Sequence, residues 1–343
     1  MVNKLYFLTF VLFFSSYFHS VPDDDSLPVL GDYSSASISL SGEYQLGRLW
    51  LAMYRGSTRE HDDPMMRTYL EDLIYRLSET SEVRDRRFEF LILEDQSINA
   101  FAAPGGIIGI NLGMFLNTQK EGELASVMCH ELAHLSQRHY ARTQNQTSPL
   151  LNALMILGSI AVAAASRNPE AIMIAPAAMQ QMSINYTRSN EKEADRIGFN
   201  NLVKAGFDPN DMTMMFQRMQ DKYQNENSEQ FSYLMTHPLP SERLTDMRIR
   251  TDDLKKSSKQ LYRDNIDFHF MQKRAEVWAE KDARKLVKKY KKNLKSPVKN
   301  NSISSKYGLS LSHKKLKNYD EAFTVLRELI KESPNNLVLE ASL

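Results

Sequence analysis

The stretch VMCHELAHLSQRH, residues 127–139, constrains this chain most, because it specifies a helix and a chemistry together. Positions four apart lie on one face of a helix, which lets His130 and His134 direct ring nitrogens at one metal ion. Neutral imidazole suits zinc. Glu131 lies about 100° further round the helix, where its carboxylate can take a proton from an attacking water. The motif predicts one zinc ion per chain, held by two histidines beside a general base.

A helix from about 119 to 142 is expected to carry this motif. Apolar residues flank the histidines, and Thr118 and Glu121 have the spacing of a capping box that would start the helix. Cys129, the only cysteine, points away from the metal face and is expected to pack in the core. A single thiol also excludes an internal disulfide bond.

His139 follows the motif closely, but it stands one residue short of the third ligand of metzincins. Tyr140 occupies that position, and Gln137 stands where those enzymes carry a glycine. We therefore expect His139 to be a surface or capping histidine rather than a zinc ligand.

A downstream carboxylate is the better third ligand, because a catalytic zinc needs three protein ligands and an open position. The segment SNEKEADRIGF, residues 189–199, offers Glu191 and Asp195 one helical turn apart, with Glu193 on another face. This pairing lets Glu191 bind zinc while Asp195 accepts a hydrogen bond from a ligand histidine. Taken alone, the acidic turn would instead indicate a solvated helix face.

The remaining periodicities predict an α+β protein, in which a mostly helical domain with a small β-sheet is followed by an α-helical segment. A Pro-Gly-Gly turn at 104–106 should join two of the strands. The expected elements, in order, are helices at 41–56 and 64–79, a strand at 87–95, two strands within 98–115, and a helix at 185–205.

The N-terminus has the layout of a secretory signal peptide at 1–20, with one lysine, a short apolar run and small polar residues. It predicts export, with an uncleaved anchor as the alternative. An acidic, turn-rich leader at 21–40 follows. A second apolar stretch, 148–166, is expected to form a buried helical hairpin with 171–184 rather than a membrane span, which leaves contact with a membrane surface open.

The C-terminal part becomes rich in lysine, and 253–300 is predicted to be a basic helical linker whose solvated face could also meet anionic lipid. Residues 306–336 fit one tetratricopeptide repeat, a helix–turn–helix with a closing proline, within a partial repeat region at 301–343. One repeat cannot bury its own face. It therefore either packs on helices at 260–295 or belongs to a longer array.

Three segments, HELAH, NEKEADRIGF and THPLPSER, resemble in this order the gluzincins that include the HtpX-like and CAAX-prenyl-protease-like zinc metallopeptidases. The segment INAFAAPGG, the predicted export and the C-terminal repeat narrow the resemblance to periplasmic members that support outer-membrane assembly. The resemblance covers roughly residues 28–336. It implies a zinc metallopeptidase domain at 41–252, while the repeat array of those proteins is longer than the one here.

Residue by residue, the resemblance implies zinc on His130, His134 and Glu191, with Glu131 as the base. It places Asp195 beside a ligand histidine, where the carboxylate would fix the orientation of the ring.

In THPLPSER, the resemblance puts His237 near the metal and Arg243 in a supporting position. His237 could donate to the oxyanion of the tetrahedral transition state. It could also take the fourth zinc position and hold the enzyme latent until substrate displaces it. We expect both roles, in different states.

Substrate binding is predicted at an exposed edge strand formed by Asn99, Ala100, Phe101 and Ala102. An unfolded polypeptide can add to such an edge through backbone hydrogen bonds, which demand little side-chain identity. This favours misfolded chains over one fixed sequence.

The leading hypothesis is a periplasmic zinc endopeptidase that degrades misfolded or stalled outer-membrane proteins. Its partners would be those polypeptides and, through the repeat, the outer-membrane assembly machinery. Nucleic acid is not an expected partner, because a net charge of +1 gives no global attraction to it. The alternative is a chaperone-like scaffold that binds the assembly machinery with little or no proteolysis.

Overall fold

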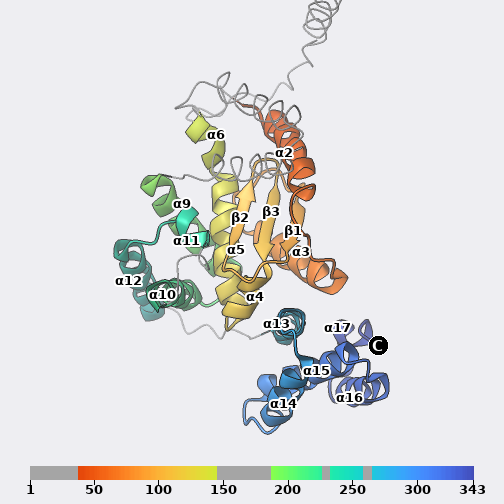
Figure 1. Cartoon of the computed structure of the whole chain (residues 1–343). Coiled ribbons are helices and arrows are strands. Elements are labelled where there is room, and N and C mark those ends of the chain that lie inside the picture. The colour runs from red at the N-terminus through yellow and green to blue at the C-terminus, as the bar shows by residue number, and fades with distance from the viewer. Residues whose placement is uncertain (1–37, 145–186, 226–231, 258–264) are drawn as a thin grey trace, which may run out of the picture. The chain divides into compact units, whose positions relative to one another are not determined.

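The computed structural model (Figure 1) describes four segments of the chain: residues 38–144, 187–225, 232–257 and 265–343. The predicted signal peptide, nearly all of the predicted leader, and the apolar stretch 148–166 with its partner 171–184 lie outside the described residues. Among the helices within them, none is long and apolar enough to cross a bilayer.

Three strands form a small sheet in the order β1-β3-β2: β1 is Glu89–Leu93, β2 is Ala100–Ala103 and β3 is Ile107–Asn111. β1 runs parallel to β3, and β2 pairs with β3 antiparallel. The turn between β2 and β3 holds Gly105 and Gly106 at φ of 78° and 76°, a left-handed conformation that glycine adopts without steric cost. The predicted strands and the predicted turn are confirmed.

Helices cover both faces of this sheet, because side chains alternate between the faces along each strand. α2 (Leu40–Arg55) packs Leu51 and Tyr54 against one face, in a cluster that includes Phe101. α3 (Pro64–Glu79) packs on the other face, within the main apolar cluster. Both helices agree with the predicted ranges, and the predicted α+β class is confirmed.

The motif helix α5 (Glu121–Ser136) lies against β2 and is buried along almost its whole length. Cys129 belongs to the main apolar cluster, as predicted, and burial raises the pKa of its thiol. The predicted capping box is wrong. Lys120 is the N-cap, and the hydroxyl of Thr118 donates to a carbonyl of the preceding short helix α4 (Leu112–Asn117), which keeps it from capping α5.

The prediction of one continuous helix at 119–142 is also wrong, because the helix is interrupted at Arg138. α5 ends two residues earlier, and Arg138 adopts a φ of 50°, in the left-handed region. This conformation costs a non-glycine residue about 1–2 kcal/mol. The guanidinium of Arg138 is held by the Glu43 carboxylate at 3.2 Å and by the carbonyl of Ile38. A second helix, α6 (His139–Gln144), begins directly after the break.

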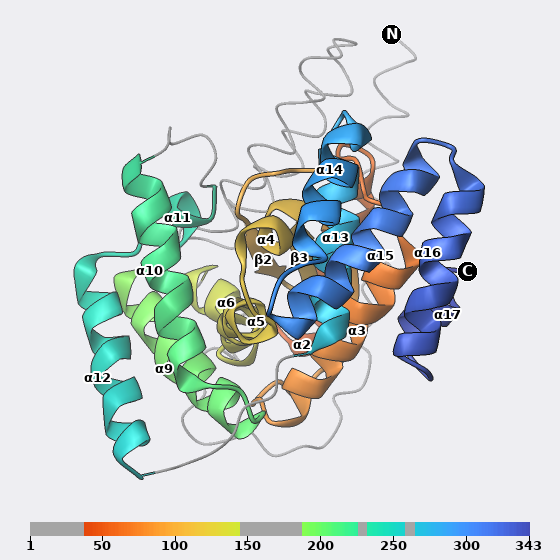
Figure 2. The same cartoon turned by 90° about the horizontal axis from the view of Figure 1, so that it is seen from below.

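α9 (Arg188–Lys204) crosses α5 at close range, and it confirms the helix predicted at 185–205. Gly198 makes this approach possible, because a Cβ atom there would lie only 3.0 Å from the backbone nitrogen of His130. The helices that follow are α10 (Pro209–Asn225), α11 (Ser232–Thr236) and α12 (Ser241–Ser257). Figure 2 shows α9 next to α5, with α10 and α12 beside α9.

The described residues end with α13 (Ile266–Ala279), α14 (Ala283–Asn293), α15 (Lys299–Lys315), α16 (Tyr319–Glu332) and α17 (Leu337–Glu340). α13 contacts α3 and α4, and its Phe268 and Phe270 belong to the main apolar cluster. α15 packs on α13, α14 and α16. The helix–turn–helix predicted at 306–336 is therefore present and packs on the preceding helices, whereas its assignment as a tetratricopeptide repeat and the predicted domain boundaries stay predictions.

Candidate metal centre

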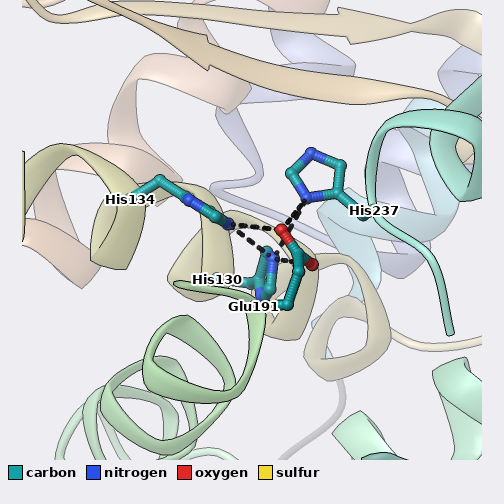
Figure 3. A group of neighbouring side chains, drawn as sticks. All are labelled: His130, His134, Glu191 and His237. Atoms are coloured by element: carbon teal, nitrogen blue, oxygen red, sulfur yellow. Dashed lines mark hydrogen bonds and ion pairs between the residues drawn. The ribbon is translucent and has the colours of Figure 1, made fainter. Parts of the chain in front are cut away.

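Four side chains from three parts of the chain meet at one buried point (Figure 3). His130 and His134 come from α5, Glu191 comes from the first turn of α9, and His237 directly follows α11. None of the four is more than 2% exposed. One ligand atom from each lies within 4.8 Å of the others.

The spacing of these atoms fits a zinc ion. The Nε2 atoms of His130 and His134 lie 2.9 Å apart, and oxygens of Glu191 lie 3.5 and 3.4 Å from them, respectively. The Nδ1 atom of His237 lies 3.4 Å from Nε2 of His130 and 3.0 Å from Oε1 of Glu191. Ligand atoms around a tetrahedral zinc are separated by about 3.3 Å. Three imidazoles and a carboxylate are also donors that zinc accepts, and zinc is the cofactor that this centre takes.

Two helices aim three of the ligands. One helical turn separates His130 from His134 on the buried surface of α5. Thr187 caps α9 by accepting a hydrogen bond from the backbone N–H of Asn190, at 3.2 Å. This cap starts α9 where Glu191 falls in its first turn, facing the two histidines.

Tyr233 holds the fourth candidate ligand. The backbone N–H of His237 donates to the carbonyl of Tyr233 at 2.8 Å, and the N–H of Tyr233 donates to the carbonyl of Ile98 at 3.2 Å. The two rings stack with 4.6 Å between their centroids. Sequence reasoning did not single out Tyr233, although its place one helical turn before His237 was an available indication.

A buried ion-pair network surrounds Glu191. Arg243 donates to both oxygens of Asp195, at 2.6 and 2.7 Å, and forms an ion pair of 2.8 Å with Glu191. Asp195 also lies 3.0 Å from Nδ1 of His130, in close contact but without the alignment of a good hydrogen bond. Asp195 and Arg243 thus lie next to the candidate metal ligands.

These charges shift the ionisation of the cluster. Burial alone would lower the pKa of His130, but the carboxylates of Asp195 and Glu191 outweigh it and raise this pKa to about 9. Burial holds the pKa of His134 well below its usual value. Burial would raise the pKa of Glu191, yet the three surrounding histidines hold it well below its usual range, so that its carboxylate is ionised.

Glu131 lies beside the ligands and is only 1% exposed. Its Oε1 atom is 3.6 Å from Nε2 of His237. Burial raises the pKa of Glu131 in spite of the opposing charges of His237 and His130. A raised pKa lies closer to the pH at which the reaction would run. A general base needs such a pKa, because it has to accept a proton and later return it.

The prediction of a surface or capping position for His139 is wrong. The side chain is fully buried, with Nδ1 2.8 Å from Nδ1 of His134 and Nε2 3.2 Å from Oε2 of Glu193. The break at Arg138 explains the difference, because a continuous helix would have turned His139 away from His134. Burial lowers the pKa of His139 to about 4. The residue lies outside the group of candidate metal ligands.

The predicted substrate strand is an edge strand but not an exposed one. β2 pairs only with β3 among the described strands. Asn99, Ala100, Phe101 and Ala102 are each at most 6% exposed. α5 packs along this strand, and the carbonyl of the preceding Ile98 accepts a hydrogen bond from the N–H of Tyr233 in α11. Segments distant in the sequence therefore cover the strand that the local pattern had predicted to be exposed.

Comparisons with known proteins agree with this geometry. The model of "Peptidase family M48" matches residues 64–251. The putative β-barrel assembly-enhancing protease of Vibrio cholerae is 36% identical over 323 residues, and that of Yersinia pestis is 33% identical over 325. Each match covers 92% of this chain but 65% of the relative, so the chain spans less than two thirds of their length. The mitochondrial metalloendopeptidase OMA1 of Schizosaccharomyces pombe is 27% identical over 197 residues, 56% of each chain.

Proposed function

Because the chain belongs to peptidase family M48, we propose that it is a zinc-dependent endopeptidase. The observation that carries the proposal is the meeting of His130, His134 and Glu191 at one buried point, with Glu131 next to the first of them on the same helix. Three protein ligands with a neighbouring carboxylate are the arrangement that hydrolytic zinc sites use.

Each residue of the centre has a role in this reaction. His130, His134 and Glu191 would hold a zinc ion, which would act there as a Lewis acid that polarises a carbonyl oxygen and lowers the pKa of water. Glu131 accepts a proton from the attacking water and passes it to the leaving amine. The Asp195 carboxylate, 3.0 Å from Nδ1 of His130, favours a proton on that nitrogen and so leaves Nε2 for the metal, and Arg243 balances the charge of the buried carboxylates.

His237 controls access to the centre. Its Nδ1 atom lies 3.4 Å from Nε2 of His130, so that the imidazole would act as a fourth ligand to a zinc ion held by His130, His134 and Glu191, and the enzyme would then be latent. A substrate must displace the imidazole to reach the zinc. After displacement, the same ring remains close enough to donate to the oxyanion of the transition state. The buried state of β2, where substrate would add at 99–102, agrees with latency.

The substrates are misfolded or stalled outer-membrane proteins. The names of the relatives from Vibrio cholerae and Yersinia pestis, which refer to β-barrel assembly, support this class. The chain acts in the periplasm after export by the signal peptide at 1–20, and its helices at 301–343 bind the assembly machinery.

Replacing Glu131 by glutamine in the full chain tests the proposal. We expect cleavage of an unfolded β-barrel protein to fall by about 10²–10⁴-fold, because the base is lost while the ligands stay. Zinc content, measured by atomic absorption, should equal that of the wild type. Glu79→Gln, at the exposed end of α3, is the matched control and should cleave normally.

Two outcomes would contradict the peptidase. One is a Glu131→Gln protein that cleaves at the wild-type rate, and the other is a wild-type chain that binds no zinc. If the Glu131→Gln protein supported outer-membrane assembly as well as the wild type does, a chaperone-like scaffold would account for the function instead.

A further inference from the structure

We propose that His139 and Glu193 form a hydrogen-bonded relay that holds His134 in the orientation and tautomer that bind the metal. The inference rests on the metal centre proposed above and extends it outward from the ligands. His139 is a positioning residue in this scheme, since it touches a ligand and not the metal.

The contacts run in one line from α9 to the centre. Oε2 of Glu193 lies 3.2 Å from Nε2 of His139, and Nδ1 of His139 lies 2.8 Å from Nδ1 of His134. Nε2 of His134 then faces Glu191, at 3.4 Å. Each ring of this line therefore uses one nitrogen toward each neighbour.

Only one placement of protons lets His134 bind a metal. A metal takes the lone pair of Nε2, so the proton of His134 must sit on Nδ1. That N–H donates to Nδ1 of His139, which must accept, and the proton of His139 is then on Nε2. There it donates to the carboxylate of Glu193, which can only accept. The reverse placement would put a proton on Nε2 of His134 and block metal binding.

The same logic holds for the other histidine of α5. Nδ1 of His130 meets a carboxylate directly, because Asp195 lies 3.0 Å away. His134 reaches a carboxylate of α9, that of Glu193, through the ring of His139, and Asp195 lies on the same helix α9. Contacts of this kind fix the tautomer of a ligand histidine and increase its basicity.

Three further contacts keep the relay in place. Arg142 donates to the Glu193 carboxylate at 2.9 Å, from the helix that begins with His139. Arg138 breaks the motif helix with its left-handed φ of 50°, and its guanidinium is bound by Glu43 and by the carbonyl of Ile38. Without the break, His139 would lie about 140° round the helix from His134 and could not contact it.

The test is zinc affinity in the full chain, measured by competition with a chromogenic zinc chelator. His139→Phe keeps a ring but removes both nitrogens, and we expect zinc to bind roughly 10–100-fold more weakly. His139→Asn keeps an acceptor for the N–H of His134, and it should recover most of this loss. The absorption bands of the cobalt-substituted protein should shift in His139→Phe and return in His139→Asn.

His61→Phe is the matched control. His61 is half-buried and lies 3.5 Å from the Glu94 carboxylate, which gives the same pairing of imidazole and carboxylate away from the metal ligands. This variant should bind zinc as the wild type does. Glu193→Ala provides a second route, because its side chain is 27% exposed and its loss should not disturb the core. Its zinc affinity should fall in the same direction as that of His139→Phe.

The outcomes separate this inference from the proposed function. If His139→Phe and Glu193→Ala both bind zinc as tightly as the wild type, the relay is overturned while the peptidase stands. A loss equally large in His139→Asn would also overturn the relay, since packing alone would then explain it. If the wild type binds no zinc, both proposals fail. Should His139→Phe not fold, Glu193→Ala decides alone.

Discussion

Arg243 and Asp195 form a buried ion pair with two contacts, 2.6 Å from Nε to Oδ2 and 2.7 Å from Nη2 to Oδ1. Arg243 also donates to the carbonyl of Pro238 at 2.6 Å. Through these contacts it joins the residues next to His237 to α9. The pair therefore links the segments that carry two candidate metal ligands far apart in the sequence, His237 and Glu191.

We expect Arg243→Met to lower the free energy of unfolding by about 3–5 kcal/mol, because two buried carboxylates would lose their counter-charge. Arg243→Lys should cost less but remain destabilising, since an ammonium group cannot make both contacts to Asp195. Urea unfolding of the metal-free protein measures both. Arg250→Lys, in the exposed pair with Asp246, is the control and should change little. An Arg243→Met protein as stable as the wild type would show that the pair adds nothing.

His237→Ala should bind small zinc-chelating inhibitors, such as a peptide hydroxamate, more tightly than the wild type. The physical reason is that, in the proposed latent arrangement, the inhibitor has to displace the His237 imidazole, and the variant lacks this imidazole. We expect about a tenfold lower inhibition constant, equivalent to about 1.4 kcal/mol. Calorimetric titration of the metal-loaded protein with the inhibitor gives the dissociation constant, which should fall by the same factor. His313→Ala, on α15, serves as the control. Equal affinities for both variants would argue against a latch at this position.

Gly198→Ala should destabilise the protein, although alanine is the better helix former by about 1 kcal/mol. Its Cβ atom would lie 3.0 Å from backbone atoms of Cys129 and His130, which cannot move aside as a side chain can. Pushing α9 away from α5 would also withdraw Glu191 from the histidines, and zinc affinity should fall together with the free energy of unfolding. Chelator competition and urea unfolding test both effects.

Gly42→Ala is the matched control for this prediction. Gly42 lies in the helix α2, and a Cβ atom there would meet only the side chains of Ile38 and Ser39, at 3.3 and 3.4 Å. This variant should keep or gain stability. If Gly198→Ala and Gly42→Ala had the same free energy of unfolding and the same zinc affinity, the close approach of α9 to α5 at Gly198 would not be needed for either property.

Asp211→Asn should stabilise the protein at neutral pH. Burial, together with the charges of Asp208 and Glu123, raises the pKa of Asp211 to about 6 in spite of Lys120. A carboxyl group with a raised pKa in the folded state favours folding most below its unfolded pKa and loses that contribution as pH rises through the folded value. The gain from Asp211→Asn is therefore small near pH 4, grows toward pH 6, and is constant above it.

We expect the gain to reach about 1–3 kcal/mol at pH 8, since a shift of one pKa unit corresponds to about 1.4 kcal/mol. Chemical unfolding at pH 4.5 and pH 8 compares the two proteins. Asp72→Asn, at an exposed position of α3, should show no such difference between the two pH values. A gain that is equal at both pH values would refute the assignment to Asp211.

Most of the secondary structure could be predicted from the sequence because the burial that shapes it is periodic along the chain. The helices α2, α3 and α9, the three strands and the glycine turn all follow from such local patterns. The prediction failed at Thr118 and at Arg138. The left-handed residue at 138 is stabilised by Glu43, about a hundred positions away, and no local pattern contains that contact.

The candidate site divides in the same way. Helical spacing alone indicated His130, Glu131 and His134, because the backbone of one helix fixes the distances between them. The acidic turn at 189–199 made Glu191 a candidate third ligand, but taken alone it also fitted a solvated helix face. The packing of α9 on α5 brings Glu191 to the two histidines, and His237, which only the resemblance had indicated, joins the same buried group.

What the sequence determined by itself was the chemistry within single helices, where rise and turn per residue set the geometry. The tertiary structure decided what lies between helices. It turned His139 inward, buried the strand at 99–102, and brought Asp195 and Arg243 next to the candidate ligands. The reason is that distances between segments depend on close packing, ion pairs and one missing side chain at Gly198, which join residues that are remote in sequence.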